Sequence, residues 1–151
     1  MSHLSLNSPL GPLTVFEEDG LLVSLDWGRA PVAAQAPTLL LKTAKDQLDA
    51  YFEGRLTIFD LPLAPAATRF QTKIRHALQD IPYGKVLTYG ELARRLGSAP
   101  RAVGGACGAN PLPLIVPCHR VVGANGRMTG YSGGGGLATK EALLRLEGAL
   151  P

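Results

Sequence analysis

Two apolar-rich runs near the start of the chain predict a β-hairpin. Leu13–Phe16 and Leu21–Trp27 consist largely of aliphatic and aromatic residues, and each has the length of a short strand. Glu18-Asp19-Gly20 lies between them, and acidic residues followed by glycine are typical of a tight turn. The pattern therefore predicts two antiparallel strands joined by a short loop.

A helix and a further strand are predicted after this hairpin. In Thr38–Phe52 the apolar residues recur at the spacing of one helix face, and Gly54 follows as a candidate C-cap. Leu56–Leu61 has the composition of another strand, and the prolines and alanines after it indicate a linker near residue 65. The first part of the chain is therefore predicted to be rich in strands.

The remainder of the chain is predicted to be mostly helical. Phe70–Leu78 places its apolar residues on one helix face. Thr88-Tyr89-Gly90-Glu91 has the sequence of a capping box, in which the hydroxyl and the carboxylate satisfy opposite backbone donors. The helix that begins there is expected to end at Gly97, and Ser98-Ala99-Pro100 starts another helix almost at once. Two helices joined by a tight glycine-containing turn are typical of a helix-turn-helix.

The second helix of this pair carries almost no bulky side chains. Its small residues are Ala102, Gly104, Gly105, Ala106, Gly108 and Ala109. Since a glycine costs about 1 kcal/mol of helix stability relative to alanine, close approach to another surface is the expected compensation. That surface is either a neighbouring helix or a DNA groove, and Arg101 in the first turn favours the groove. A last helix is predicted at Lys140–Leu146.

Composition restricts the class of protein. The 151 residues suffice for one compact domain, or for one domain with a small appendage. With 46% hydrophobic and 18% charged residues, an intrinsically disordered chain is excluded. No apolar run approaches the ~20 residues of a membrane span, and the first residues lack the features of a signal peptide. We therefore expect a soluble, cytoplasmic protein with no membrane partner.

Charge is distributed unevenly along the chain. Residues 1–65 contain four basic and eight acidic residues, a net charge of −4. Residues 66–151 contain eleven basic and four acidic residues, a net charge of +7. A basic C-terminal half indicates a polyanionic partner such as nucleic acid, although a charge division without function is the alternative.

Cys118 beside His119 is the clearest chemical signal in the sequence. A free cysteine has a pKa of about 8.5, so a neighbouring base is needed to produce the reactive thiolate at neutral pH. The alternative is a buried, unreactive cysteine next to a structural histidine. Cys107 is the other cysteine, and two are too few for a disulfide scaffold or a cysteine-rich zinc site.

The string Pro-Cys-His-Arg-Val-Val at 117–122 resembles the active-site motif of the 6-O-methylguanine-DNA methyltransferase family. The likeness extends over residues 66–150 through motifs in the same order: Phe70, Tyr83-Gly84-Lys85-Val86, Tyr89, Arg101, Asn110, Tyr131-Ser132-Gly133-Gly134 and Glu147-Gly148. Earlier residues match only loosely. The resemblance implies an α+β fold, with a small N-terminal ribonuclease-H-like β-sheet domain at 1–65. A mainly helical domain with a helix-turn-helix would follow at 66–151.

The resemblance also implies a DNA repair reaction that consumes the protein. Cys118 would attack the alkyl carbon on the oxygen of 6-O-alkylguanine, with 4-O-alkylthymine left open as a second substrate. His119 would take the thiol proton through a water, and Glu147 would orient and stabilise the imidazolium. Asn110 would tie the recognition helix to the nucleophile's segment. Glu147 ends the last helix, where a carboxylate is unfavourable unless a cation balances it, and a solvated surface glutamate is the alternative.

The residues implied to bind substrate serve a flipped-out base, because the target base lies inside a duplex. The Tyr89 hydroxyl would donate a hydrogen bond to a ring nitrogen of the base. Arg101 would fill the space that the flipped base leaves in the duplex. Pro113 and Tyr131 would lie on either side of the base. The carbonyls of Cys118 and Val121 would accept hydrogen bonds from its exocyclic amine, and Ser132 and Lys140 would face its oxygen. Ser98 would contact the DNA. The implied partner is double-stranded DNA containing alkylated guanine, bound by a monomer.

The chain departs from the family in three places. Animal members carry an N-terminal zinc site, whereas His3 is the only cysteine or histidine in residues 1–65, so we expect no metal and no cofactor. Cys107 stands in the recognition helix, where the motif requires no thiol. Gly133–Gly136 is two residues longer than the usual Tyr-Ser-Gly-Gly-Leu, so the resemblance does not predict the geometry of this loop.

Two other classes of protein are compatible with parts of this pattern. Alkyltransferase-like binding modules share the helix-turn-helix and an arginine such as Arg101 but lack the cysteine. Because this chain contains Cys118, it is less well described as such a module. A transcription regulator or redox sensor would use Cys118 as its sensing thiol. The short chain offers such a regulator no obvious separate effector domain.

Overall fold

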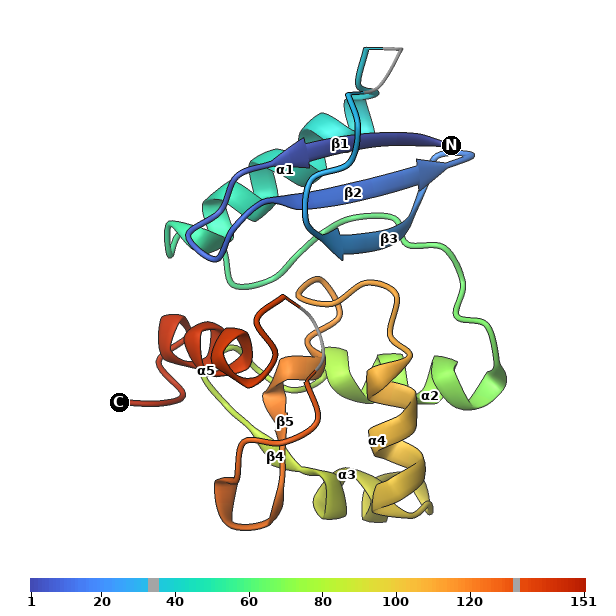
Figure 1. The fold of residues 1–151 in the computed structure, drawn as a ribbon. Helices are drawn as coiled ribbons and strands as arrows, with labels where there is room; N and C mark the ends of the chain where they lie inside the picture. The colour runs from blue at the N-terminus through green and yellow to red at the C-terminus, as the bar shows by residue number, and fades with distance from the viewer. Residues whose placement is uncertain (33–35, 132–133) are drawn as a thin grey trace. The chain divides into compact units, whose positions relative to one another are not determined.

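The computed structural model describes residues 1–32, 36–131 and 134–151. The chain divides into two compact units, Met1–Ala64 and Pro65–Pro151, shown as ribbons in Figure 1. The first unit contains a sheet and one long helix, and the second is mainly helical, so the predicted α+β class is confirmed. Within the described residues, no helix is both long enough and apolar enough to cross a membrane.

The sheet of the first unit has three antiparallel strands in the order β1-β2-β3. These are β1 at Ser2–Leu6, β2 at Leu13–Glu18 and β3 at Leu21–Trp27. The predicted hairpin is confirmed, and its turn places Asp19 and Gly20 at φ values of 52° and 80°. This left-handed backbone is the one that Gly and Asp tolerate best.

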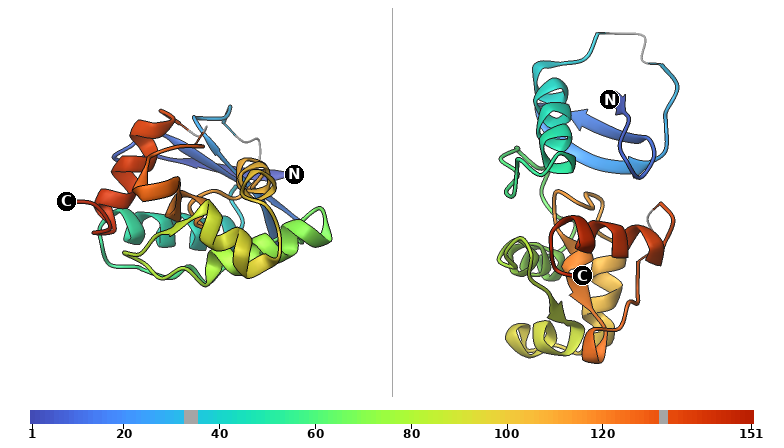
Figure 2. Two further views of the ribbon diagram at one scale, coloured as in Figure 1. Left: turned by 90° about the horizontal axis from the view of Figure 1, so that it is seen from below. Right: turned by 90° about the vertical axis from the view of Figure 1, so that its left-hand side faces the viewer.

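Helix α1, at Leu39–Phe52, covers the sheet of the first unit and confirms the predicted helix (Figures 1 and 2). Thr38 caps its first turn, because the Thr38 hydroxyl accepts from the Leu41 amide at 3.1 Å. The buried face of α1 and the inner face of the sheet form one core, made of Leu41, Ala44, Leu48, Tyr51, Leu13, Val15, Leu22 and Leu25.

The strand predicted at Leu56–Leu61 is wrong. The segment is irregular, and the Asp60 backbone bonds to a side chain instead of a strand. The Gln47 amide donates to the Asp60 carbonyl and accepts from the Asp60 amide, both at 2.9 Å. The hydrophobic pattern also did not indicate β1, which contains only two leucines beside two serines and a histidine.

The second unit begins with three helices: α2 at Arg69–Gln79, α3 at Tyr89–Leu96 and α4 at Pro100–Gly108. The capping box is present, with Thr88 as the N-cap of α3. Gly97 ends α3 in the left-handed conformation, φ 62°, so that the chain turns directly into α4. Helices α3 and α4 pack against each other, which confirms the predicted helix-turn-helix.

A two-residue parallel pairing joins distant parts of the second unit. Strand β4, at Leu87–Thr88, pairs with β5 at Val121–Val122. The 3-10 turn η1, at Cys118–Arg120, directly precedes β5, and a second such turn, η2, covers Ala124–Gly126. The pairing therefore brings the start of α3 beside the segment that carries the cysteine.

Helix α5, at Leu137–Leu146, closes the second unit and begins three residues earlier than predicted. Gly136 precedes it with φ 67°, a conformation that favours glycine. The helix contacts η1, and its buried leucines join the core of this unit, which contains Ile74, Leu78, Ile81, Leu92, Val103, Leu112, Leu143 and Leu144.

Candidate active site

Cys118 begins η1, at the end of a tightly folded segment of the second unit. Pro113 and Val116 form an isolated bridge, and Leu114 between them has φ 76°, which is uncommon for a residue with a side chain. The Cys118 amide donates to the Val116 carbonyl at 2.8 Å. A strained backbone of this kind persists only where its surroundings hold it, so the preceding segment fixes the position of the thiol.

Asn110 connects the end of α4 with the same segment. Its Nδ2 donates to the Val116 carbonyl at 3.0 Å, and its Oδ1 accepts from the Leu112 amide at 3.0 Å. The side chain also forms a hydrogen bond that favours the thiolate of Cys118. A single amide side chain thus links the end of α4, the second helix of the helix-turn-helix, to the segment that carries Cys118.

Burial raises the pKa of the Cys118 thiol above its ordinary value. The Asn110 hydrogen bond and the positive charge of Lys140 act in the opposite direction but do not outweigh burial. The resting side chain is therefore a thiol, and a base must remove its proton when it reacts.

His119 is the base that the structure offers. Its side chain is fully buried, and Nε2 lies 2.7 Å from Oε2 of Glu147. Because a carboxylate only accepts hydrogen bonds, Nε2 carries the proton and Nδ1 carries the lone pair. Nδ1 is buried and has no hydrogen-bond partner among the described residues. Burial lowers the pKa of His119, although Glu147 favours the protonated form. The imidazole is therefore neutral and has one nitrogen open to accept a proton.

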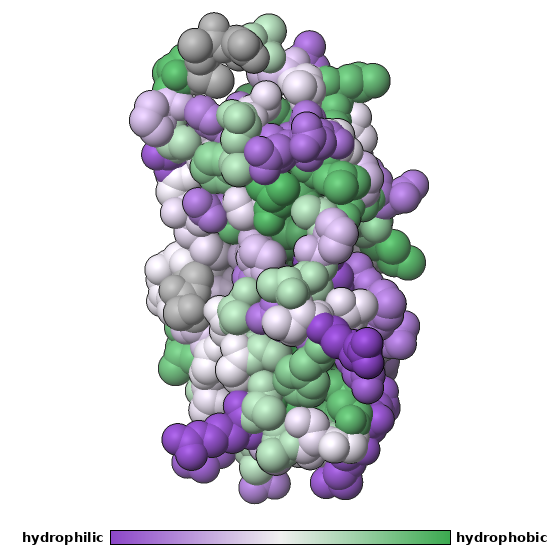
Figure 3. Space-filling model, turned by 90° about the vertical axis from the view of Figure 1, so that its right-hand side faces the viewer, coloured by the Kyte–Doolittle hydropathy of each residue, from purple (hydrophilic) through white to green (hydrophobic). Residues whose placement is uncertain are grey.

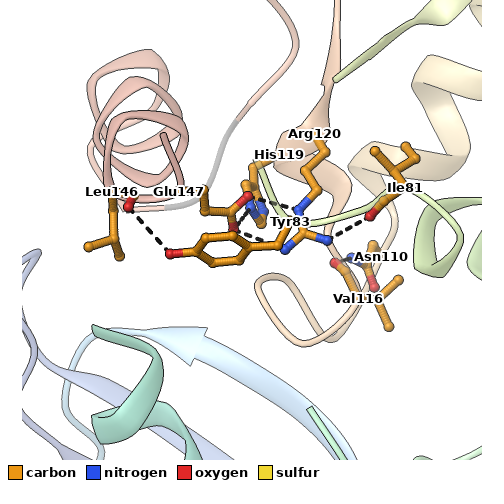
Figure 4. A network of polar contacts seen from close by, with 8 residues as sticks. All are labelled: Ile81, Tyr83, Asn110, Val116, His119, Arg120, Leu146 and Glu147. Carbon is orange, nitrogen blue, oxygen red and sulfur yellow. Dashed lines mark hydrogen bonds and ion pairs between the residues drawn. The ribbon is translucent and has the colours of Figure 1, made fainter. Parts of the chain in front are cut away.

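Arg120 supplies the cation that a carboxylate at a helix C-terminus requires. Its Nε donates to Oε1 of Glu147 at 2.8 Å, and its Nη2 donates to Oε2 at 3.1 Å. Glu147 caps the C-terminus of α5, where the helix dipole opposes a negative charge. Figure 4 shows His119 and Arg120 approaching the same carboxylate. The alternative of a solvated surface glutamate does not apply, since Glu147 is only 4% exposed.

Tyr89 and Lys140 meet at the backbone of residue 129. The Lys140 ammonium donates to the carbonyls of Val121 and Thr129 at 2.5 and 2.6 Å, and it lies 5.6 Å from the centre of the Tyr89 ring. The Tyr89 hydroxyl donates to the Thr129 carbonyl at 3.4 Å. Burial, with smaller contributions from the charges of the two cysteines, raises the pKa of Tyr89 to about 12. The hydroxyl therefore remains protonated and able to donate.

The remaining site residues predicted from the sequence differ in their place in the second unit and in their exposure. Arg101 is exposed in the first turn of α4, and Ser98 is half-buried in the turn before it. Pro113 belongs to the folded segment before Cys118, and Tyr131 is half-buried. Ser132 lies outside the described residues, as does Gly133 of the glycine run.

Exposed basic residues cover the helix-turn-helix and its surroundings. They are Arg69 and Lys73 of α2, Lys85 in the segment before β4, Arg94 and Arg95 of α3, and Arg101 of α4. On the face shown in Figure 3, hydrophilic residues lie along the margins of the lower end of the second unit, around a less polar centre, and Figure 1 places α3 and α4 at this end. Such a surface can bind phosphates.

Cys107 is buried on α4 and differs from Cys118 in its surroundings. Burial raises its pKa to about 12, with the charge of Cys118 adding to the shift. No base such as His119 follows it in the chain. Neither thiol is in a disulfide, and no cluster of three metal-ligating side chains occurs among the residues that the structure describes.

Sequence reasoning missed Arg120 and the Thr129 carbonyl. Arg120 stands in the quoted motif, directly after His119, and the position of Glu147 at a helix end already required a cation. The Thr129 carbonyl had no signal, because a backbone group that accepts from two side chains leaves no trace in composition or periodicity.

Two family models together match nearly the whole chain. Residues 1–65 match the ribonuclease-like domain of 6-O-methylguanine DNA methyltransferase, and residues 69–149 match the DNA binding domain of the same protein. The first match supports the ribonuclease-like fold expected of the N-terminal sheet.

Relatives and solved structures agree with the family models. The chain is 42% identical to a methylated-DNA–protein-cysteine methyltransferase of Methanosarcina acetivorans, over 99% of both chains. It is 44% identical to one from Mycobacterium tuberculosis, over 96% of this chain and 91% of the relative. The crystal structure of Mycobacterium tuberculosis OGT in complex with DNA superimposes with a TM-score of 0.85, covering 97% of this chain and 92% of that one at 44% identity.

Proposed function

The chain belongs to the 6-O-methylguanine DNA methyltransferase family, and on this premise we propose that it repairs DNA by moving an alkyl group from 6-O-alkylguanine to Cys118. It would thus be a methylated-DNA–protein-cysteine methyltransferase whose molecules each act once. The observation that carries this proposal is the buried thiol next to a neutral imidazole, which is bound to Glu147 on one nitrogen and open on the other.

The transfer is an in-line displacement at the alkyl carbon. The Cys118 sulfur forms a bond to that carbon while the bond from the carbon to the guanine oxygen breaks. The thiol proton passes to His119 Nδ1 by way of a water, and Glu147 stabilises the imidazolium that results. The proton then returns to the departing guanine, which leaves as the neutral base. Because the product is a thioether, the protein is not regenerated.

The groups around Tyr89 would recognise the flipped base. The Tyr89 hydroxyl, protonated at neutral pH, would donate to a ring nitrogen as negative charge develops there. Lys140 would face the guanine oxygen, and the carbonyls of Cys118 and Val121 would accept from the exocyclic amine. In the free protein the Val121 carbonyl accepts from Lys140, and its second lone pair is what could accept from the exocyclic amine.

DNA would bind at the helix-turn-helix. Arg101 is exposed at the start of α4, and the small residues after it permit close approach of the helix to a groove. Flipping costs a few kcal/mol of stacking and pairing, which Arg101 offsets by filling the vacated position. Ser98 would contact the backbone beside it, and Pro113, Tyr131 and Ser132 would enclose the base.

The test is stoichiometric repair of a duplex. An excess of duplex carrying one 6-O-methylguanine is incubated with a known amount of protein, and the restored guanine is counted. We expect repair to stop at one guanine for each protein molecule and to be absent in Cys118→Ala, which should still bind the duplex. Repair that continues over many turnovers, or that survives in Cys118→Ala, contradicts the proposal. The same assay with 4-O-methylthymine tests the second substrate.

The setting of the reaction belongs to the same proposal. Cys118 must remain reduced to react, and a reducing cytoplasm provides that condition. We propose that the protein works there as a monomer, since the residues of the proposed chemistry all lie between 89 and 147 of one chain. We also propose that 1–65 and 66–151 are its two domains, with the chemistry and the DNA contacts in the second.

A further inference from the structure

Arg120 places a permanent positive charge against the pair formed by His119 and Glu147. Both carboxylate oxygens of Glu147 are held: Oε1 by Arg120 Nε, and Oε2 by Arg120 Nη2 together with His119 Nε2. The side chains of His119 and Glu147 are fully buried, and that of Arg120 is 8% exposed. A buried carboxylate with this many donors has its orientation fixed.

The guanidinium is itself held on its other side. Arg120 Nη1 donates to the Ile81 carbonyl at 2.7 Å, and the Tyr83 ring lies 5.7 Å from Arg120 Cζ (Figure 4). The Tyr83 hydroxyl donates to the carbonyl of Leu146, the residue before Glu147. Arg120 therefore uses its planar fork in two directions at once, which a lysine cannot reproduce.

The charges around His119 decide which form of the imidazole is stable. Glu147, at the end of α5, attracts a proton to the ring, whereas Arg120 of η1 and Lys140 of α5 repel it. Cys118 of η1 is a neutral thiol at rest, and Tyr83, after α2, faces Arg120 rather than the ring. With Arg120 in place the carboxylate is already neutralised, so an imidazolium would leave the buried site with an extra positive charge. Without Arg120, an imidazolium would be the closest cation to Glu147.

We propose that Arg120 is the positioning residue of this site: by sharing the Glu147 carboxylate with His119, it orients the imidazole and keeps Nδ1 unprotonated until the thiol proton arrives. The proposal rests on the alkyl transfer proposed above, in which Nδ1 accepts that proton. An imidazolium in the resting protein would already carry a proton on Nδ1 and could not act as the base.

The test compares three variants of the full chain with the wild type. Arg120→Met removes the charge, Arg120→Lys keeps the charge without the fork, and Arg120→Met combined with Glu147→Gln removes both charges as the matched control. The titration of His119 is followed by nitrogen-15 NMR of labelled histidine, with His119→Asn used to assign its signal. The rate of Cys118 alkylation by free 6-O-benzylguanine is measured over the same pH range.

The proposal predicts a coupled shift in both measurements. In Arg120→Met, the midpoint of the His119 titration should rise by about one to three pH units. The reason is that the negative charge of Glu147 then acts on the imidazole without the opposing positive charge of Arg120. The acidic limb of the alkylation rate should rise by the same amount, with about a tenfold loss for each pH unit below the new midpoint. The double variant should bring the midpoint back down, to below that of the wild type, because the hydrogen bond and charge of Glu147 raise the His119 pKa by more than the charge of Arg120 lowers it. Arg120→Lys should keep the wild-type midpoint while reacting more slowly at every pH.

Other outcomes overturn the proposal. If Arg120→Met lowers the rate equally at every pH and leaves the His119 titration unchanged, Arg120 only supports the fold. If Arg120→Met does not fold, a raised midpoint or a fully wild-type rate in Arg120→Lys overturns the proposal in the same way. The titration does not depend on activity, so a wild type that takes up no alkyl group while the midpoints shift as expected refutes the proposed function alone.

Discussion

Replacing Gly130 by alanine should reduce alkyl transfer while affecting stability only moderately. Gly130 has φ +76°, and a Cβ at this position would lie 2.5 Å from the Tyr89 hydroxyl oxygen and 3.4 Å from Cζ. No side-chain methyl tolerates a contact of 2.5 Å, so one of the two groups must move. The hydroxyl is the end of a side chain and its hydrogen bond to Thr129 is long, at 3.4 Å. We expect Tyr89 to move.

A matched control variant separates the loss of stability caused by the alanine from the loss of reaction rate. Gly126 has φ +78° and no atom within 4 Å of its ideal Cβ. A left-handed conformation costs a residue with a side chain about 1–2 kcal/mol, so Gly126→Ala and Gly130→Ala should lose similar stability. Only Gly130→Ala should also lose the Tyr89 hydrogen bond to the base. One such bond contributes about 1–1.5 kcal/mol, which corresponds to about a tenfold slower reaction.

Thermal unfolding and the single-turnover rate of Cys118 methylation by duplex DNA measure these costs. In a Tyr89→Phe background the clashing oxygen is absent, so adding Gly130→Ala should slow the reaction little further. Equal rates for Gly126→Ala and Gly130→Ala would refute the assignment of Tyr89 as a donor to the base. Equally large additional losses in the Tyr89→Phe background would show that alanine disturbs the loop itself.

Three further predictions follow from the same geometry. Arg101→Ala should lose far more activity on duplex DNA than on free 6-O-benzylguanine, whereas equal losses would assign Arg101 to the fold or to the base site. Because burial lowers the pKa of His119 in the folded protein, the unfolded chain binds a proton below about pH 6.5 that the folded chain does not. The free energy of unfolding should therefore fall as the pH drops through this value. Chemical denaturation at several pH values should show a smaller fall in His119→Asn than in the wild type. A metal chelator should leave methyl transfer unchanged, and loss of transfer restored by zinc would contradict the expectation of a metal-free site.

Local signals in the sequence predicted the elements that carry the site. The capping box at Thr88, the stop at Gly97 and the proline at the start of α4 act within a few residues of themselves, and the helix-turn-helix follows from them. The strand expected at Leu56–Leu61 failed for a non-local reason, since a side chain on α1 takes the backbone groups that a strand would use. Apolar composition alone does not show which partner a backbone will find.

The candidate site was likewise predicted only in part from the sequence. The motif around Cys118 identified the thiol, the imidazole and, by resemblance, Glu147, but it did not reveal that Arg120 shares the carboxylate. Nor could it show that Lys140 occupies the Val121 carbonyl in the free protein, because that contact joins α5 to β5. Such contacts depend on how distant segments meet, and only the folded chain contains that information.

The central claim, that Cys118 is the alkyl acceptor, is tested most directly by mass spectrometry of the whole protein and of its peptides after reaction with duplex DNA containing 6-O-methylguanine. The chain contains two cysteines, so the peptides must separate Cys107 from Cys118. The account predicts a gain of one methyl group on each molecule, carried entirely by the peptide with Cys118. An unchanged mass, or a methyl group on Cys107, would contradict it.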